Sequence, residues 1–196
     1  MPLVGPVLGG LIAKEFASAG FSGTYSLSLA MAIGNGIIVD IQSKNFYQGQ
    51  SIGIGTGAGV GTGTIKGIVG PIVGKIIYGY MIQNNLTGTK NIDLANAVGN
   101  AFASHITAGI VTSASAPVAN GTGIGTLKGI VGISVAASIF AFMKAFGLTG
   151  TQSANLSFAI GDGIATALKA GIIQTTIVGG GYPPSPTSGT DVGKMV

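Results

Sequence analysis

The sequence predicts a mainly helical protein with short β-strands, built as three tandem repeats of an αα-hairpin followed by an extended strand and a glycine-rich ribbon. Three features support this fold class: a recurring turn sequence, an apolar stripe with helical spacing that occurs three times, and glycine-rich segments between the copies. Glycine supplies 36 of the 196 residues without a G-X-Y period, which excludes collagen. Because 46% of the residues are hydrophobic, we expect the chain to fold rather than remain disordered.

A short turn sequence marks each copy. The strings FSGT, LTGT and LTGT begin at Phe21, Leu86 and Leu148, so successive copies are offset by 65 and 62 residues. Each string is followed at the same distance by a similar segment, LAMAIGNGI, LANAVGNAF or LSFAIGDGI. Upstream of the turns, the pentapeptide KGIVG occurs at 66–70 and again at 128–132. The repeats therefore span 1–64, 65–126 and 127–179, and 180–196 form an extended C-terminal tail.

Each repeat is expected to begin with a helix. Pro6 and Pro71 suit the first helical position, where the missing N–H costs nothing, and apolar residues continue for about 14 positions. The glycine of the turn is predicted to take the left-handed conformation that closes this helix, and its threonine is predicted to cap the next one. These turn residues are Gly23 and Thr24, Gly88 and Thr89, and Gly150 and Thr151.

The second helix of each repeat carries the clearest periodicity in the chain. A large apolar residue recurs every four positions, which predicts one helix face packed against its partner helix. Small residues beside this stripe permit a close approach of two helices. The stripe is Leu29, Ile33, Ile37, Ile41, Leu94, Val98, Phe102, Ile106, Leu156, Ile160, Ile164 and Leu168, and the small residues are Ala32, Ala97, Ala159, Gly34, Gly99 and Gly161.

Extended strands are predicted after the second helices. Gly109 and Gly171 suit the position that follows a helix end, and 110–112 and 172–178 then have β-type composition. In the first repeat, 46–54 occupy the corresponding place.

Glycine and threonine ribbons at 53–67 and 120–129 join the repeats and share the ending G-x-G-x-G-T-[IL]-K-G. We interpret them as linkers or as extended strands between subunits. The tail is too small to build a core of its own, and we expect neighbouring subunits to hold it. Its candidate intersubunit contacts are Tyr182, Pro183, Pro184 and Pro186.

The sequence predicts no catalytic, cofactor-binding or metal-binding residues. No P-loop can be written, there is no cysteine, and the single histidine, His105, cannot form a multi-histidine metal site. General acid–base chemistry needs carboxylates held together, and the acidic residues are dispersed. They are Glu15, Asp40, Asp93, Asp162 and Asp191. We therefore predict that the protein is not an enzyme.

Charge is scarce. Nine basic and five acidic residues give a net charge of +4, and the lysines are scattered and accompanied by no arginine, so nucleic-acid binding is not expected. A surface with so little charge is suited to contact with another protein or with lipid. The N-terminal MPLVGPVLGG lacks the basic region of a signal peptide, and we do not expect Sec export.

In its repeated turn, its G-x-G-x-G-T ribbons and its extended tail, the chain resembles small Gly/Ala/Thr-rich virion structural proteins of tailed bacteriophages. The resemblance implies a structural subunit of the virion head, neck or baseplate, assembled in the host cytoplasm. Its expected partners are copies of itself, as a homo-oligomer, and other structural proteins, which it would bind through the glycine-rich arms and tail. Three repeats would present three quasi-equivalent contact surfaces.

Membrane insertion, as a holin-like or pore-forming protein, is the main alternative. The most apolar stretch is 127–148, of which 130–143 carry no charge. Fourteen helical residues rise about 21 Å, less than the roughly 30 Å of a bilayer core. Lys128 and Lys144 bracket this stretch closely.

Overall fold

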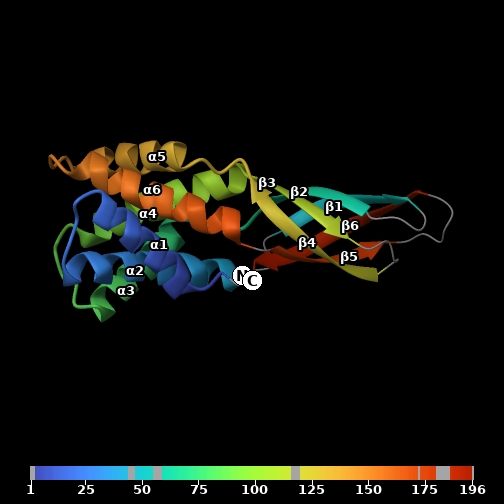
Figure 1. Ribbon diagram of the computed structural model, residues 1–196, viewed down its shortest axis with the longest axis horizontal. Helices are drawn as coiled ribbons and strands as arrows, with labels where there is room; N and C mark the ends of the chain where they lie inside the picture. The colour runs from blue at the N-terminus through green and yellow to red at the C-terminus, as the bar shows by residue number, and fades with distance from the viewer. Residues whose placement is uncertain are drawn as a thin grey trace.

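The computed structural model describes residues 3–43, 47–54, 59–115, 120–171, 173–179 and 186–195. Within these ranges the chain forms six α-helices and six β-strands. The helices gather into a bundle at one end of an elongated molecule, and the strands form a closed barrel at the other end (Figure 1). The prediction of a mainly helical protein is confirmed.

The element order runs helix, helix, strand, strand three times. The first four elements are α1 (Gly5–Ser18), α2 (Thr24–Gln42), β1 (Tyr47–Ile54) and β2 (Gly59–Ile65). The next four are α3 (Gly70–Gln83), α4 (Asn91–Ala108), β3 (Ile110–Ser115) and β4 (Asn120–Lys128). The last four are α5 (Gly132–Ala145), α6 (Ser153–Ala170), β5 (Ile173–Gly179) and β6 (Pro186–Met195).

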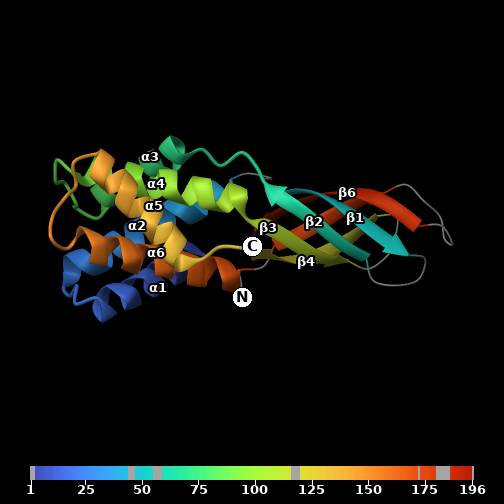
Figure 2. The ribbon, with the colours of Figure 1, turned by 90° about the horizontal axis from the view of Figure 1, so that it is seen from above.

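The six described helices pack as a closed ring. α1 packs on α2, α3 on α4 and α5 on α6, and each pair packs on the next through α2 with α3 and α4 with α5. Contact between α6 and α1 closes the ring. Two perpendicular views show the helices running along the long axis of the molecule, with the barrel continuing from one end of the bundle (Figures 1 and 2).

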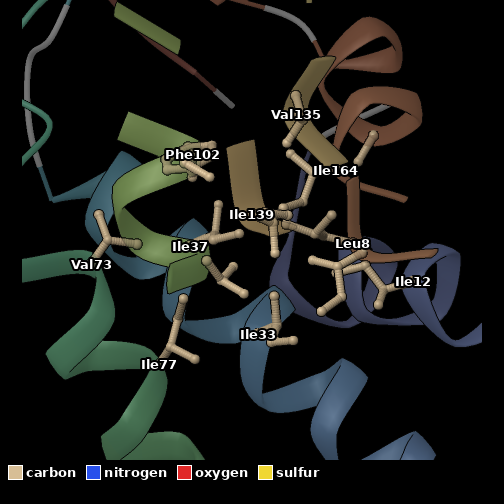
Figure 3. Packing of buried hydrophobic residues seen from close by; sticks show 14 of the residues in the cluster. Leu8, Ile12, Ile33, Ile37, Val73, Ile77, Phe102, Val135, Ile139 and Ile164 are labelled. Carbon is tan, nitrogen blue, oxygen red and sulfur yellow. The ribbon is translucent and has the colours of Figure 1, made fainter. Parts of the chain in front are cut away.

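All six helices contribute to one hydrophobic core. Its side chains come together in the interior of the ring, where they are almost completely shielded from solvent (Figure 3). Burial of this apolar surface is the main favourable contribution to folding. Residues labelled in the figure are Leu8, Ile12, Ile33, Ile37, Val73, Ile77, Phe102, Val135, Ile139 and Ile164.

The first helix of each pair is closed by a left-handed residue that lies three positions before the glycine predicted from the sequence. These residues are Gly20, Asn85 and Gly147, with φ of 84°, 58° and 73°. In each case the next amide donates to the carbonyl five residues back, which satisfies a free carbonyl at the helix end. The bonds are Phe21 to Phe16 at 2.8 Å, Leu86 to Met81 at 2.9 Å and Leu148 to Met143 at 2.8 Å.

The predicted roles of the Gly-Thr turns were therefore wrong. Gly23 has a φ of 111° but serves as the N-cap of α2, and Gly88 and Gly150 are not among the described residues with positive φ. The carbonyls of Gly88 and Gly150 instead accept backbone hydrogen bonds from Asn91 and Ser153, both at 3.0 Å. These glycines open a turn that leads into the next helix.

The threonines do not cap the second helices. Thr24 is the first residue of α2, while Thr89 and Thr151 precede the N-cap residues, Lys90 and Gln152. No side-chain cap hydrogen bond is present at any of these three helix starts. The N-cap therefore lies one residue after the predicted position at Thr89 and Thr151, and one residue before it at Thr24.

The barrel is closed in sequence order, and every neighbouring pair of strands is antiparallel. β6 completes it by pairing with both β5 and β1. The predicted strands at 46–54, 110–112 and 172–178 correspond to β1, β3 and β5, although Phe46 and Ile172 lie outside the described residues.

The ribbons and the tail also belong to this barrel. β2 and β4 come from the two ribbons, and β6 comes from the tail. They pair within the chain, whereas the sequence predicts linkers or intersubunit strands for the ribbons and contacts with neighbouring subunits for the tail. Among the candidate tail contacts, Pro186 begins β6, and Tyr182, Pro183 and Pro184 lie outside the described residues.

Glycines occupy one face of the barrel strands from the ribbons. In β2, Gly59, Gly61 and Gly63 share a face with Ile65, which is buried, whereas the neighbouring Thr64 is exposed. The glycines of β4 share a face with the buried Leu127 in the same way. Glycine thus recurs at every second position of β2 and β4, in register with the buried Ile65 and Leu127.

Candidate interaction surface

The polar side chains of the described residues form separate contacts, and no metal-binding cluster is among them. No group of three or more His, Asp or Glu side chains in this part of the protein could hold a metal ion. His105 Nε2 is hydrogen-bonded to Ser138 Oγ at 2.9 Å, and this bond links α4 to α5. Lys90 Nζ donates to Asp93 Oδ2 at 3.2 Å, at the start of α4. The first of these contacts joins two helices and the second lies within the start of one helix, so they do not converge on one site.

The predicted apolar stripe lies in the core. Nine of its twelve residues are buried, and the first residue of each stripe, Leu29, Leu94 or Leu156, is half-buried and packed against the core. Ala32, Ala97 and Ala159, beside the stripe, are buried as well. The stripe thus positions α2, α4 and α6 and leaves no surface for a ligand.

Close backbone contacts join the two helices of each hairpin. A Cβ built on Gly34 would lie 2.7 Å from the backbone oxygen of Gly5. A Cβ on Gly99 would lie 2.5 Å from the oxygen of Gly70, and one on Gly161 would lie 2.8 Å from the Cα of Ala136. Real Cβ atoms essentially never approach other atoms this closely. The small residues predicted to permit close helix approach have this role in all three hairpins.

The contacts between neighbouring hairpins are less uniform. A Cβ on Gly36 of α2 would lie 2.7 Å from the Cα of Ile77, and one on Gly163 of α6 would lie 2.8 Å from the Cα of Ile12. Ala101 occupies the corresponding position of α4. The interface between α4 and α5 thus has a methyl group where the other two have none, and it carries the His105 to Ser138 hydrogen bond.

The repeated pentapeptide KGIVG takes the same conformation at both of its sites. Gly67 and Gly129 have φ of 84° and 87°. The isoleucine that follows each glycine is buried, and the next residue, Val69 or Val131, is the extended N-cap of α3 or α5. Val69 is 45% exposed and Val131 is 47% exposed. The motif therefore inserts one apolar side chain into the core and presents the next one to solvent.

Exposed apolar residues surround the junction between the bundle and the barrel. Ile72 and Ile133, in the first turns of α3 and α5, are 45% and 61% exposed. Val4, the N-cap of α1, is 39% exposed at the corresponding point of the first hairpin. The starts of α3 and α5 face the barrel end of the molecule (Figures 1 and 2). We call this set the apolar collar; it comprises Val4, Val69, Ile72, Val131 and Ile133.

The apolar collar was not predicted from the sequence. The candidate contacts were placed in the tail, because an isolated Pro/Ser/Gly segment has no core of its own. The repeated KGIVG was recognised as a mark of homology between repeats. An apolar residue directly before a helix-starting Gly-Pro or Gly-Ile pair, found at corresponding places, is the signal that could have identified the collar.

One described helix, α2, is long and apolar enough to cross a membrane, and half of its most apolar window is buried inside the protein. The chain matches no protein-family model, no curated protein and no solved structure. The fold and surface of the described residues define the class of protein: a closed ring of helical hairpins continued by a closed antiparallel barrel, with an apolar collar where the two meet.

Proposed function

We propose that the protein is a non-enzymatic structural subunit of a large symmetric assembly, composed of three tandem copies of one helix-helix-strand-strand unit. The observation that carries this proposal is the closure of the hairpin ring, in which α6 packs on α1 as α2 packs on α3. A chain closed in this way offers three similar surfaces around its long axis. Such a shape suits a threefold or sixfold environment made of identical neighbours.

The scarcity of charge supports the same role. Fourteen charged residues in a chain of 196 are few for a free-standing protein, and apolar residues remain exposed at the collar. Exposed apolar patches on a folded protein indicate contact with another molecule. We assign the contacts with neighbours to the collar, because the ribbons and the tail pair within the chain.

We extend the proposal to a tailed-bacteriophage virion, in the head, neck or baseplate, with assembly in the host cytoplasm. The resemblance of the glycine-rich ribbons and repeated turns to virion structural proteins supports this assignment. Other structural proteins of the particle would be the partners, together with copies of the chain itself. No nucleic-acid contact is part of the proposal.

The mass of the recombinant full chain, measured by size-exclusion chromatography with light scattering in detergent-free buffer, tests the proposed role. A soluble, discrete species is expected. Cryo-electron microscopy of purified particles should then place the protein on or around a threefold or sixfold axis. Recovery from membranes with detergent alone, or absence of the protein from particles, would contradict the proposal.

A membrane-inserting, holin-like or pore-forming protein is the second candidate, because α2 passes the length and hydropathy criteria for a membrane span. Insertion of α2 would expose Ile33, Ile37 and Ile41, which are fully buried in the hairpin ring. The bundle would therefore have to open. Flotation of the full chain with liposomes separates the two candidates: a protein that stays in the aqueous fraction supports the structural role.

A further inference from the structure

We infer that the two KGIVG sites are docking corners, each of which binds an acidic, apolar segment of a neighbouring protein. The α3 corner consists of Lys66, Val69 and Ile72, and the α5 corner consists of Lys128, Val131 and Ile133. This inference rests on the proposed structural role, and it names the chemistry of the partner that the collar meets.

Both corners present the same combination of groups. An exposed lysine is followed by a glycine in the left-handed region, a buried isoleucine and an exposed valine. The left-handed glycine lies in a turn between the lysine and the valine. The isoleucine, 7% exposed at Ile68 and 2% exposed at Ile130, anchors this turn to the core. The exposed side chains are thus held by a fixed backbone, which lowers the conformational entropy lost on binding.

Charge complementarity indicates the nature of the partner. The first turns of α3 and α5 contain no acidic residue. Lys75 adds a third exposed ammonium group, one helical turn further along α3. Among the described residues, Asp93 forms a salt bridge with Lys90 at the end of the bundle away from the two corners. A partner segment with carboxylates beside apolar side chains would satisfy both the lysines and the exposed valine and isoleucine.

The placement of the corners favours a protein partner over a lipid bilayer. α3 and α5 lie on different sides of the bundle: α5 runs along the upper edge of the first view, and α3 along the upper edge of the perpendicular view (Figures 1 and 2). A flat bilayer in contact with one corner leaves the other facing away. Separate protein segments, one from each of two neighbours, can occupy both corners at once.

Two charged residues distinguish the corners: Lys75 lies on α3 alone, and a carboxylate lies beside the start of α5 alone. A Cβ built on Gly70 would collide with the side chain of Asn100, and a Cβ built on Gly132 would collide with the carboxylate of Asp162. Asn100 and Asp162 therefore occupy the same place beside the starts of α3 and α5. The exposed carboxylate of Asp162 repels an acidic segment, so the α5 corner binds that segment more weakly than the α3 corner.

The test is an NMR titration of the full chain with a short soluble peptide of leucine, alanine and glutamate, and with a control peptide that has glutamine in place of glutamate. Amide shifts at 66–72 and 128–133 report each corner separately. The glutamate peptide is expected to bind both, about two- to fivefold more tightly at the α3 corner, as for an exposed charge contact. Asp162→Asn should strengthen binding at the α5 corner and leave binding at the α3 corner unchanged.

Val69→Ser provides the matched variant, because serine is a favoured N-cap residue and preserves the start of α3. It should weaken binding at the α3 corner and leave the α5 corner unchanged. Four results would overturn the inference: no binding of the glutamate peptide, equal binding of the glutamine peptide, shifts confined to other surfaces, or binding to vesicles of phosphatidylglycerol. None of these alters the mass or particle measurements that test the proposed function, so the two failures are distinguishable.

Discussion

Gly34 of α2 lies directly on the backbone of Gly9 of α1: a Cβ built on Gly34 would be 2.7 Å from the Cα of Gly9. Gly99 of α4 approaches Gly74 of α3 in the same way, with a corresponding distance of 2.9 Å. The two helices of a hairpin thus touch through their main chains. This contact leaves no room for any side chain at Gly34 or Gly99.

Gly34→Ala should destabilise the protein by about 1 to 3 kcal/mol, because the new methyl group would overlap backbone atoms that cannot rotate away. Gly10→Ala, on the same hairpin, is the control. No atom lies within 4 Å of a Cβ at Gly10, and alanine in a helix is favoured over glycine by about 0.5 to 1 kcal/mol. Chemical denaturation of both variants measures the difference. Equal stabilities would contradict the close contact.

Alanine substitutions at two glycines with open space around them, one in a left-handed turn and one inside a helix, should change stability in opposite directions. Gly20 has a φ of 84°, and no atom lies within 4 Å of a Cβ built there. Gly20→Ala should cost about 1 to 2 kcal/mol from backbone strain alone. Gly79→Ala, inside α3 and also in open space, should be stabilising. Melting temperatures that move in the same direction would argue against the turn geometry.

The interface between α4 and α5 depends on a polar contact. Ser138→Ala removes the partner of His105 and should cost about 0.5 to 1.5 kcal/mol. Ser134→Ala, on the exposed part of α5, is the control and should change stability by less than about 0.5 kcal/mol. Hydrogen exchange should accelerate in α4 and α5 of the Ser138 variant. Hydrogen exchange that accelerates equally in all helices would show that the α4–α5 interface does not open independently of the rest of the bundle.

Two phenylalanines, one buried in α4 and one exposed on α6, test the core. Phe102 is 1% exposed, and Phe102→Ala should destabilise the protein by about 3 to 5 kcal/mol. Phe158 is 46% exposed, and Phe158→Ala should have a much smaller effect. Urea denaturation followed by circular dichroism checks both. A large loss at Phe158 would place that ring in an interface that a single chain does not show.

The helices were predictable because the sequence patterns that specify a helix lie within the helix itself. The four-residue spacing from Ile33 to Ile41 and the prolines at Pro6 and Pro71 require no knowledge of distant residues, and the helices occur at those places. The helix-closing residue was misplaced because it is Asn85 in the second repeat and glycine (Gly20, Gly147) in the other two, whereas the later turn position is glycine in all three.

The barrel could not be predicted because its pairing is not local. β6 must lie between β5 and β1, and no pattern within 186–195 specifies a partner that far away in the chain. The glycine-rich ribbons were interpreted as linkers or as extended strands between subunits, whereas they form strands that pair within the chain. The apolar collar was missed for a related reason: the repeated valine before each helix start marks the position in the sequence, but the exposure of Val69 and Val131 depends on the tertiary arrangement around them.

Because β6 pairs with both β1 and β5, the barrel cannot close until β6 has been synthesised. β6 follows β1 and β5 in the chain, so until its residues emerge from the ribosome β1 and β5 each keep an open edge. Unpaired strand edges invite pairing with other chains. A polypeptide released before β6 would carry two such edges permanently, so premature termination of translation yields an aggregation-prone product rather than a shorter version of the protein.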